Sequence, residues 1–125
     1  MDEYTESVRA TIAVAAKAAH NTTRCYCQAI GDDSQPVWDD APTWQRESAI
    51  AGVEAIFRNP RLAPADSHNL WWDQKLRHGW TWGHEKDPEK KTHPCMLPYR
   101  ELPPALRAKD VIFGAVVRGV LGFDQ

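Results

Sequence analysis

The segment from Ser67 to Tyr99 constrains the fold most, because it concentrates aromatic rings, cations and turn-forming residues in a short stretch of chain. Four of the six tryptophans lie in it, interleaved with basic residues: Trp71, Trp72, Trp80 and Trp82 alternate with Lys75, Arg77, Lys86, Lys90 and Lys91. Indole rings either fill a core or stack on a planar ligand, and neighbouring cations neutralise phosphates. The residue types alone leave both interpretations open: a nucleotide-binding face, or a tryptophan-rich core with a solvated basic loop.

The chain of 125 residues is long enough for one modest hydrophobic core, so we expect residues 1–125 to form a single domain. The first residues, MDEYTES, are acidic, and no apolar run reaches the length of a membrane span. The sequence therefore predicts neither a signal peptide nor a transmembrane helix. We expect a cytoplasmic protein without a membrane partner.

The three cysteines, Cys25, Cys27 and Cys95, cannot all pair, and their spacing is not that of a disulfide framework. We expect reduced thiols. One C-x-C pair without a second closely spaced pair is weak support for zinc, so no metal site is predicted.

The net charge of −2 is unevenly distributed along the chain. Residues 1–74 hold six Lys/Arg against eleven Asp/Glu, whereas residues 75–109 hold eight against four. An acidic half would repel an extended phosphate backbone, while a local basic face can bind a few phosphates. This asymmetry favours a small anionic ligand over a long nucleic acid; a solvated basic loop is the alternative.

Apolar periodicity and breaker residues predict four helices. The first runs from Ser7 to about Ile30, and the second begins after Asp40 and ends at Asn59 before Pro60. Ser67 is the candidate N-cap of a third helix that stops at Gly79. The last follows Pro103 and Pro104 and presents a broad apolar face as far as Leu121.

The remaining local patterns concern packing. Gly52 inside the second helix predicts a close approach of another helix. Trp71 and Trp72 point about 100° apart on a helix, so one is expected in the core and the other at a cleft. Residues 80–82 and 95–97 resemble short strands that pair as a minimal hairpin. The expected fold is thus mainly α-helical and compact, with about four helices and an irregular Trp-rich loop or minimal hairpin.

The order of these residues carries a family resemblance. HNLW (His68 to Trp71), GWTWG (Gly79 to Gly83), Asp87, Lys90, HPCMLPY (His93 to Tyr99) and Leu102 follow one another at fixed spacing. This succession resembles the repeat of ryanodine receptors, the RyR domain, which also occurs alone in bacterial and phage proteins. Trp82 stands where that pattern more often has tyrosine. The resemblance is specific for residues 67–121 and weaker for residues 19–59.

The resemblance implies which side chains bind a ligand. In paired RyR repeats the tryptophan of the H-N-x-W motif stacks on the adenine of a bound nucleotide, and Trp71 matches it. His68 and Asn69 could bond a base edge or cap their helix, and Lys90 matches the family lysine. Trp82 could form a second aromatic wall with Trp80, although Trp80 is better explained as core. The candidate ligand-binding residues are Trp71, Asn69, His68, Lys90, Lys91, Trp82, Arg77 and Tyr99, of which Tyr99 also has a packing interpretation.

No arrangement of residues predicts catalysis, because the chain lacks a paired nucleophile and base, a phosphate-cradling glycine loop and an H-E-x-x-H site. The hypothesis is therefore non-catalytic binding, without a cofactor, of an adenine nucleotide or nucleotide-derived second messenger. A phage anti-defence sponge that sequesters a host immune signal is the favoured role. A helical protein–protein interaction module with no nucleotide ligand is the alternative. One H-N-x-W motif per chain predicts a homodimer, since paired repeats share the ligand between two copies.

Overall fold

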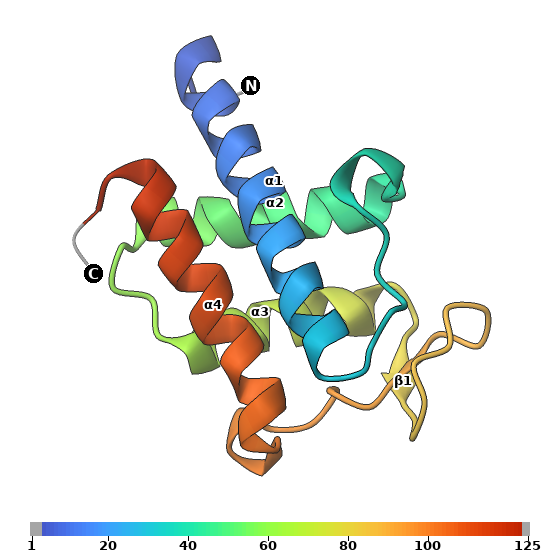
Figure 1. The fold of residues 1–125 in the computed structure, drawn as a ribbon. Helices are drawn as coiled ribbons and strands as arrows, with labels where there is room; N and C mark the ends of the chain where they lie inside the picture. Colours follow the sequence, from blue (N-terminus) through green and yellow to red (C-terminus); the bar gives the residue numbers. More distant parts are fainter. Residues whose placement is uncertain (1–3, 124–125) are drawn as a thin grey trace.

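The computed structural model describes residues 4–123, which form a mainly α-helical, compact bundle (Figure 1). Its α-helices are α1 (Glu6–Ala29), α2 (Thr43–Arg58), α3 (Pro64–Arg77) and α4 (Pro104–Leu121). Short 3-10 turns, η1 (Trp38–Asp40) and η2 (Tyr99–Glu101), lie in the connections before α2 and α4. The predicted fold class is confirmed. Within residues 4–123, no helix combines the length and apolarity that crossing a bilayer requires.

Local capping sets the helix boundaries. The Thr5 side chain accepts a hydrogen bond from the Val8 N–H at 3.2 Å and starts α1. The prediction that Ser67 caps α3 is wrong, because α3 begins three residues earlier, at Pro64. Proline presets the backbone angle of a first turn, and the Asp66 carboxylate accepts a hydrogen bond from the Ala63 N–H at 3.3 Å.

The hydrophobic core lies where α1, α2 and α4 cross (Figure 1). Its buried members are small or branched aliphatic residues: Ile12, Ala15, Ala16, Ala19, Val53, Ile56 and Val117. The alanines let the helices approach closely. The close approach predicted at Gly52 is confirmed, since a Cβ there would lie 3.1 Å from Phe113 Cζ on α4.

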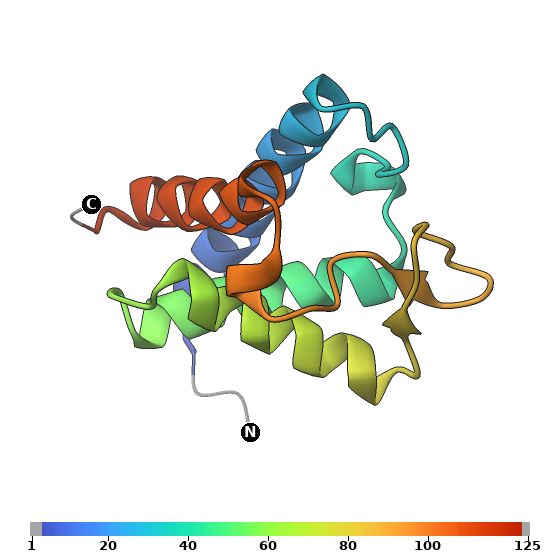
Figure 2. The ribbon, with the colours of Figure 1, turned by 90° about the horizontal axis from the view of Figure 1, so that it is seen from below.

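α2 and α3 lie side by side, and segment 80–98 lies at the end of this pair opposite to the loop that joins the two helices (Figure 2). Its strands β1 (Thr81–Trp82) and β2 (Thr92–His93) pair in parallel. The predicted hairpin between residues 80–82 and 95–97 is therefore wrong in both partner and direction. Reciprocal backbone hydrogen bonds between Asp87 and Thr92, at 3.0 and 3.1 Å, and the left-handed Lys91 (φ 56°) reverse the loop before β2.

Candidate functional site

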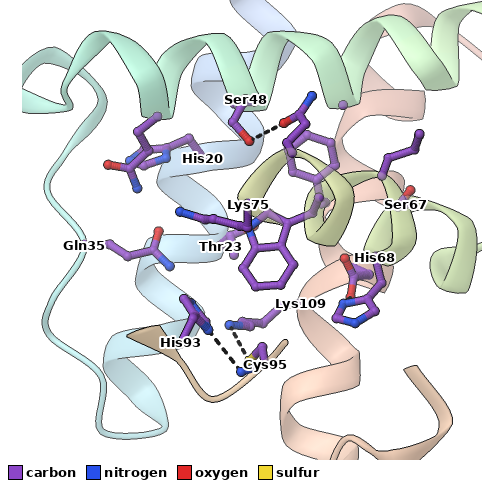
Figure 3. A pocket seen from close by; sticks show the side chains of 18 of the residues that line it. His20, Thr23, Gln35, Ser48, Ser67, His68, Lys75, His93, Cys95 and Lys109 are labelled. Atoms are coloured by element: carbon purple, nitrogen blue, oxygen red, sulfur yellow. Dashed lines mark hydrogen bonds and ion pairs between the residues drawn. The ribbon is translucent and has the colours of Figure 1, made fainter. Parts of the chain in front are cut away.

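A pocket of about 190 Å³ opens where the helices meet segment 86–95. Each helix contributes side chains: His20 from α1, Ser48 from α2, Lys75 from α3 and Lys109 from α4 (Figure 3). His93 completes the lining from the end of β2. Elements far apart in sequence thus converge on one cavity.

Two indoles, Trp44 and Trp71, line the pocket together with Phe113. Trp71 on α3 stacks on His68, with ring centroids 5.5 Å apart, and meets His93 edge-on at 4.8 Å. Trp44 on α2 packs against Trp80 at 5.9 Å. Trp44 and Trp71 both line the pocket, so a planar ligand would find two aromatic surfaces within one chain.

Lys75 is the most unusual side chain of the pocket, because it is buried without an anionic partner. Only 8% of it is exposed, and its Nζ lies 3.8 Å from the ring centroid of Trp80 and 4.3 Å from that of Trp44. Within residues 4–123, Nζ makes no hydrogen bond or ion pair. Burial, with a smaller contribution from the charge of Lys86, lowers the pKa of Lys75 to about 8. The ammonium group is therefore available to an anion in the cavity.

Two further lysines line the same pocket. Lys86 Nζ donates to Ser34 Oγ at 3.0 Å, and burial lowers the pKa of Lys86 although Asp32 acts in the opposite direction. Lys109 Nζ donates to Cys95 Sγ at 3.6 Å. Sulfur is a weak acceptor, so this contact leaves the Lys109 charge largely uncompensated.

His93 supplies a neutral donor among these cations. Its Nδ1 accepts a hydrogen bond from the Cys95 N–H at 3.0 Å, which places the ring proton on Nε2. Burial, followed by the charges of Lys109, Lys86 and Lys75, lowers the pKa of His93 to about 3. The imidazole therefore stays neutral, and its Nε2–H finds no acceptor within residues 4–123.

His68 is a buried support for the wall of the pocket. Its Nε2 donates to the Leu97 carbonyl at 2.7 Å, and its Nδ1 lies 3.8 Å from the Asp110 carboxylate. Burial lowers the pKa of His68 and raises that of Asp110 to about 7. His68 lines the pocket with 2% of its surface exposed, so it chiefly fixes the position of the Trp71 ring.

The structure brings only part of the predicted ligand-binding set to the pocket. Trp71 and His68 line it. Tyr99 packs its ring on His68 at 5.7 Å and donates its hydroxyl to the Arg107 carbonyl at 3.1 Å, as its packing interpretation requires. Trp72 also contacts His68, at 5.9 Å, without lining the cavity.

The other predicted residues lie outside the pocket: Asn69, Arg77, Trp82, Lys90 and Lys91. Asn69 and Lys90 are exposed, and Arg77 pairs with Asp73 at 2.7 Å in solvent. Lys91 Nζ donates to the His78 carbonyl at 2.9 Å. Trp82 is 45% exposed and packs on His84, whereas Trp80 is buried. The proposed aromatic wall of Trp80 and Trp82 is therefore wrong, because Trp80 lies before the strand and turns inward; its assignment to the core is confirmed.

The predicted ligand-binding residues did not include five residues of the lining: Lys75, Lys86, Lys109, His93 and Trp44. Lys75 and Lys86 had been named only as cations near the tryptophans, although positions 68, 71 and 75 share one face of a helix. Lys109 carried no signal, since its meeting with Lys86 depends on how segment 80–98 folds back. The cysteines are free, with Cys25 exposed and Cys27 and Cys95 buried. Within residues 4–123, no group of three His, Cys, Asp or Glu residues is placed to hold a metal ion.

The part of the chain that carries the predicted motifs also matches a known family. Residues 59–113 match the family model of the RyR domain. The match includes α3, both strands and the start of α4, and therefore contains Trp71, Lys75, Lys86, His93 and Lys109 of the pocket. Residues 59–113 of this chain are thus similar to the RyR domain.

Proposed function

We propose that the pocket binds an adenine nucleotide, or a second messenger derived from one, without turning it over. The observation that supports this most is the buried Lys75 ammonium group, which lies among indole rings and has no anionic partner in residues 4–123. A base can stack on Trp71 or Trp44 while the phosphate meets the lysines. Stacking contributes about 1–3 kcal/mol per base, and charge-assisted hydrogen bonds add to it.

A recessed pocket suits a small ligand better than a long strand. Its lining comes from every helix and surrounds the ligand, whereas a single-stranded nucleic acid needs an open groove that follows its backbone. The acidic residues of the first half of the chain also oppose an extended polyanion.

The second candidate function is that of a helical protein–protein interaction module, for which the match to the RyR domain leaves room. The apolar side chains that remain in solvent favour that candidate: Leu76 is 54% exposed and Trp82 is 45% exposed. A protein that binds through these exposed side chains would leave the pocket lysines uncompensated. The two candidates therefore differ in whether Trp71 or Trp82 carries the affinity.

Sequestration is the role that the proposal favours among nucleotide-binding roles. A chain that encloses a messenger and releases it slowly lowers the free concentration of that messenger. This is the action expected of a phage anti-defence protein directed at a host immune signal. Stopped flow measures the lifetime of the complex with the tightest ligand. A lifetime longer than seconds would support sequestration, and a lifetime of milliseconds would argue for a sensor.

The second indole in the lining bears on oligomeric state. The homodimer prediction rests on the single H-N-x-W motif, which leaves a lone chain short of one aromatic wall. Trp44 supplies such a wall within the chain. A homodimer remains a proposal, to be measured by light scattering with and without ligand.

The nucleotide proposal is tested by calorimetry and thermal shift with AMP, ADP, ATP and a cyclic dinucleotide. A ligand at one hundred times its dissociation constant stabilises the fold by about 2.7 kcal/mol. We expect Trp71→Ala to weaken binding at least about tenfold, which matches the loss of one stacked base. Trp82→Ala is the matched control, because it removes an exposed indole outside the pocket.

Two results would contradict the proposal. One is the absence of binding by every nucleotide tested on the folded wild-type chain. The other is an equal loss of affinity in Trp71→Ala and Trp82→Ala. If Trp71→Ala fails to fold, Trp71→Phe provides a smaller ring at the same place, and we expect it to retain intermediate affinity.

A further inference from the structure

We propose that the phosphate side of the pocket selects a doubly charged phosphate, either a terminal phosphomonoester or a pyrophosphate, over the singly charged phosphodiester of a cyclic nucleotide. The inference deepens the proposed function and rests on it. It concerns which nucleotides the pocket accepts, a property that stacking on an indole cannot determine because every base has an aromatic face.

The pocket lining contains more cationic than anionic side chains. Three of its residues are lysines, Lys75, Lys86 and Lys109, and its acidic member is Asp110. Asp32, outside the lining, offsets Lys86, since Lys86 Nζ and the Asp32 carboxylate both bond the Ser34 hydroxyl. Within residues 4–123, the ammonium groups of Lys75 and Lys109 have no carboxylate within ion-pair distance. A dianion neutralises both, whereas a monoanion leaves one cation buried and uncompensated.

The three lysines also act on one place. They come from α3, segment 86–95 and α4, yet the charge of each lowers the pKa of the same His93 imidazole. His93 is 7% exposed and lies beside Lys109 and Cys95 in the pocket (Figure 3). The three lysines line the same cavity as His93, and Lys109 is further placed by its contact with Cys95, whose N–H bonds His93 Nδ1.

Neutral donors accompany these charges. His93 Nδ1 accepts a hydrogen bond from the Cys95 N–H, so the ring proton lies on Nε2. This Nε2–H has no acceptor within residues 4–123. The Thr23 hydroxyl is buried and also lacks a partner in the part of the chain that the structure describes. Thr23 lines the pocket from α1, one turn after His20 (Figure 3). A phosphate with three terminal oxygens can accept from several such donors at once.

The pocket differs from an ordinary basic surface because one of its lysines, Lys75, is buried. Surface lysines keep their ammonium groups in water, and their phosphate contacts do not distinguish charge states sharply. Only 8% of Lys75 is exposed, and its Nζ lies between the rings of Trp44 and Trp80, so few water molecules can surround the charge. The second negative charge of the ligand therefore acts in a medium of low polarity, where it has a large effect.

The experiment uses ligands that share a base and ribose but differ in charge. Adenosine, cyclic AMP, AMP and ADP are titrated calorimetrically into the full chain at pH 7.5, where the AMP phosphate is mainly a dianion because its second pKa is about 6. We expect AMP and ADP to bind at least about tenfold more tightly than cyclic AMP, the effect of one charge-assisted contact. Adenosine should bind more weakly than cyclic AMP.

The lysines are tested with Lys86→Gln and Lys109→Gln. Each should weaken AMP at least about tenfold and adenosine less than about twofold, because only the phosphate contact is removed. Lys17→Gln is the matched control, since Lys17 is exposed on α1, outside the lining, near Asp39. If one variant fails to fold, the other and the wild-type ligand series still decide the inference.

Inorganic pyrophosphate separates this inference from the nucleotide proposal. Lysine-dependent pyrophosphate binding without nucleotide binding would retain the dianion site and reject the proposed function. Cyclic AMP or adenosine binding as tightly as AMP, with dependence on Trp71, would retain the proposed function and overturn the dianion site. Failure of all these ligands on a folded chain would overturn both.

Discussion

The apolar core and the pocket use the same helices but bury opposite kinds of side chain. α1 gives Ala15 and Ala19 to the core and, within one further turn, His20 and Thr23 to the pocket. The core buries aliphatic groups, each of which favours folding. The pocket buries lysines and an aspartate, groups that lose hydration and are left without full compensation.

This difference shows where stability and function reside in the chain. A small domain has a limited margin of stability, and an uncompensated buried charge reduces it. Aliphatic residues at the same positions would fold better, so charged ones at Lys75 and Asp110 mark a site that has another task. Mutations at the two places should therefore change stability in opposite directions.

The largest expected effect belongs to the core. Ile56→Ala removes a side chain with 0% exposure and leaves a cavity, which should lower the free energy of unfolding by about 2–5 kcal/mol. Urea denaturation measures the change, with the exposed Val14→Ala as control. Ligand affinity in the folded fraction should stay unchanged, and a specific loss of affinity would show that core and pocket are not separable.

Lys75→Met should act in the opposite direction. Methionine fills a similar volume without a charge, so at pH 7 we expect the free energy of unfolding to rise by about 1–2 kcal/mol while nucleotide binding is lost. The gain is limited because the cation–π contacts with Trp44 and Trp80 disappear. A large loss of stability in this variant would mean that the lysine is a structural element.

The pH dependence of stability identifies the same group. The pKa of Lys75 is lowered in the folded state, so its burial penalty is complete below pH 8 and disappears as pH rises towards 10.5. The wild-type chain should therefore gain stability relative to Lys75→Met over that interval, by on the order of 3 kcal/mol. Parallel pH–stability curves for the two proteins would contradict the lowered pKa.

Sequence reasoning predicted the core far better than the pocket, for a physical reason. Helical periodicity reports which face of each helix is buried, so residues such as Ile12, Val53 and Val117 follow from local spacing. Trp71 and His68 were found because their motif lies within one turn of α3. Lys86 and Lys109 reach the cavity from separate elements, and their position depends on the parallel pairing of β1 with β2. Local patterns had suggested a hairpin instead.

Tyr99→Phe tests the boundary between the two regions and should have a smaller effect. The substitution removes the hydrogen bond from the Tyr99 hydroxyl to the Arg107 carbonyl at 3.1 Å but keeps the ring on His68. We expect a loss of about 0.5–1.5 kcal/mol in unfolding free energy and no change in affinity. Thermal denaturation and calorimetry measure both quantities. A lower affinity at unchanged stability would place the hydroxyl at the ligand.

The smallest expected effect is the change in nucleotide affinity caused by a substitution in the exposed basic loop. Lys90 is exposed and does not line the cavity, so Lys90→Ala should change nucleotide affinity less than about twofold, a difference that solvent screening allows for a distant charge. Lys86→Ala is the matched comparison, because it removes the same side chain from a lysine that lines the pocket. Calorimetry at two salt concentrations distinguishes them, since screening affects an exposed charge more than a buried one. If Lys90→Ala weakens binding as much as Lys86→Ala, the ligand reaches the exposed loop, and the site extends beyond the cavity to the residues that the family resemblance first indicated.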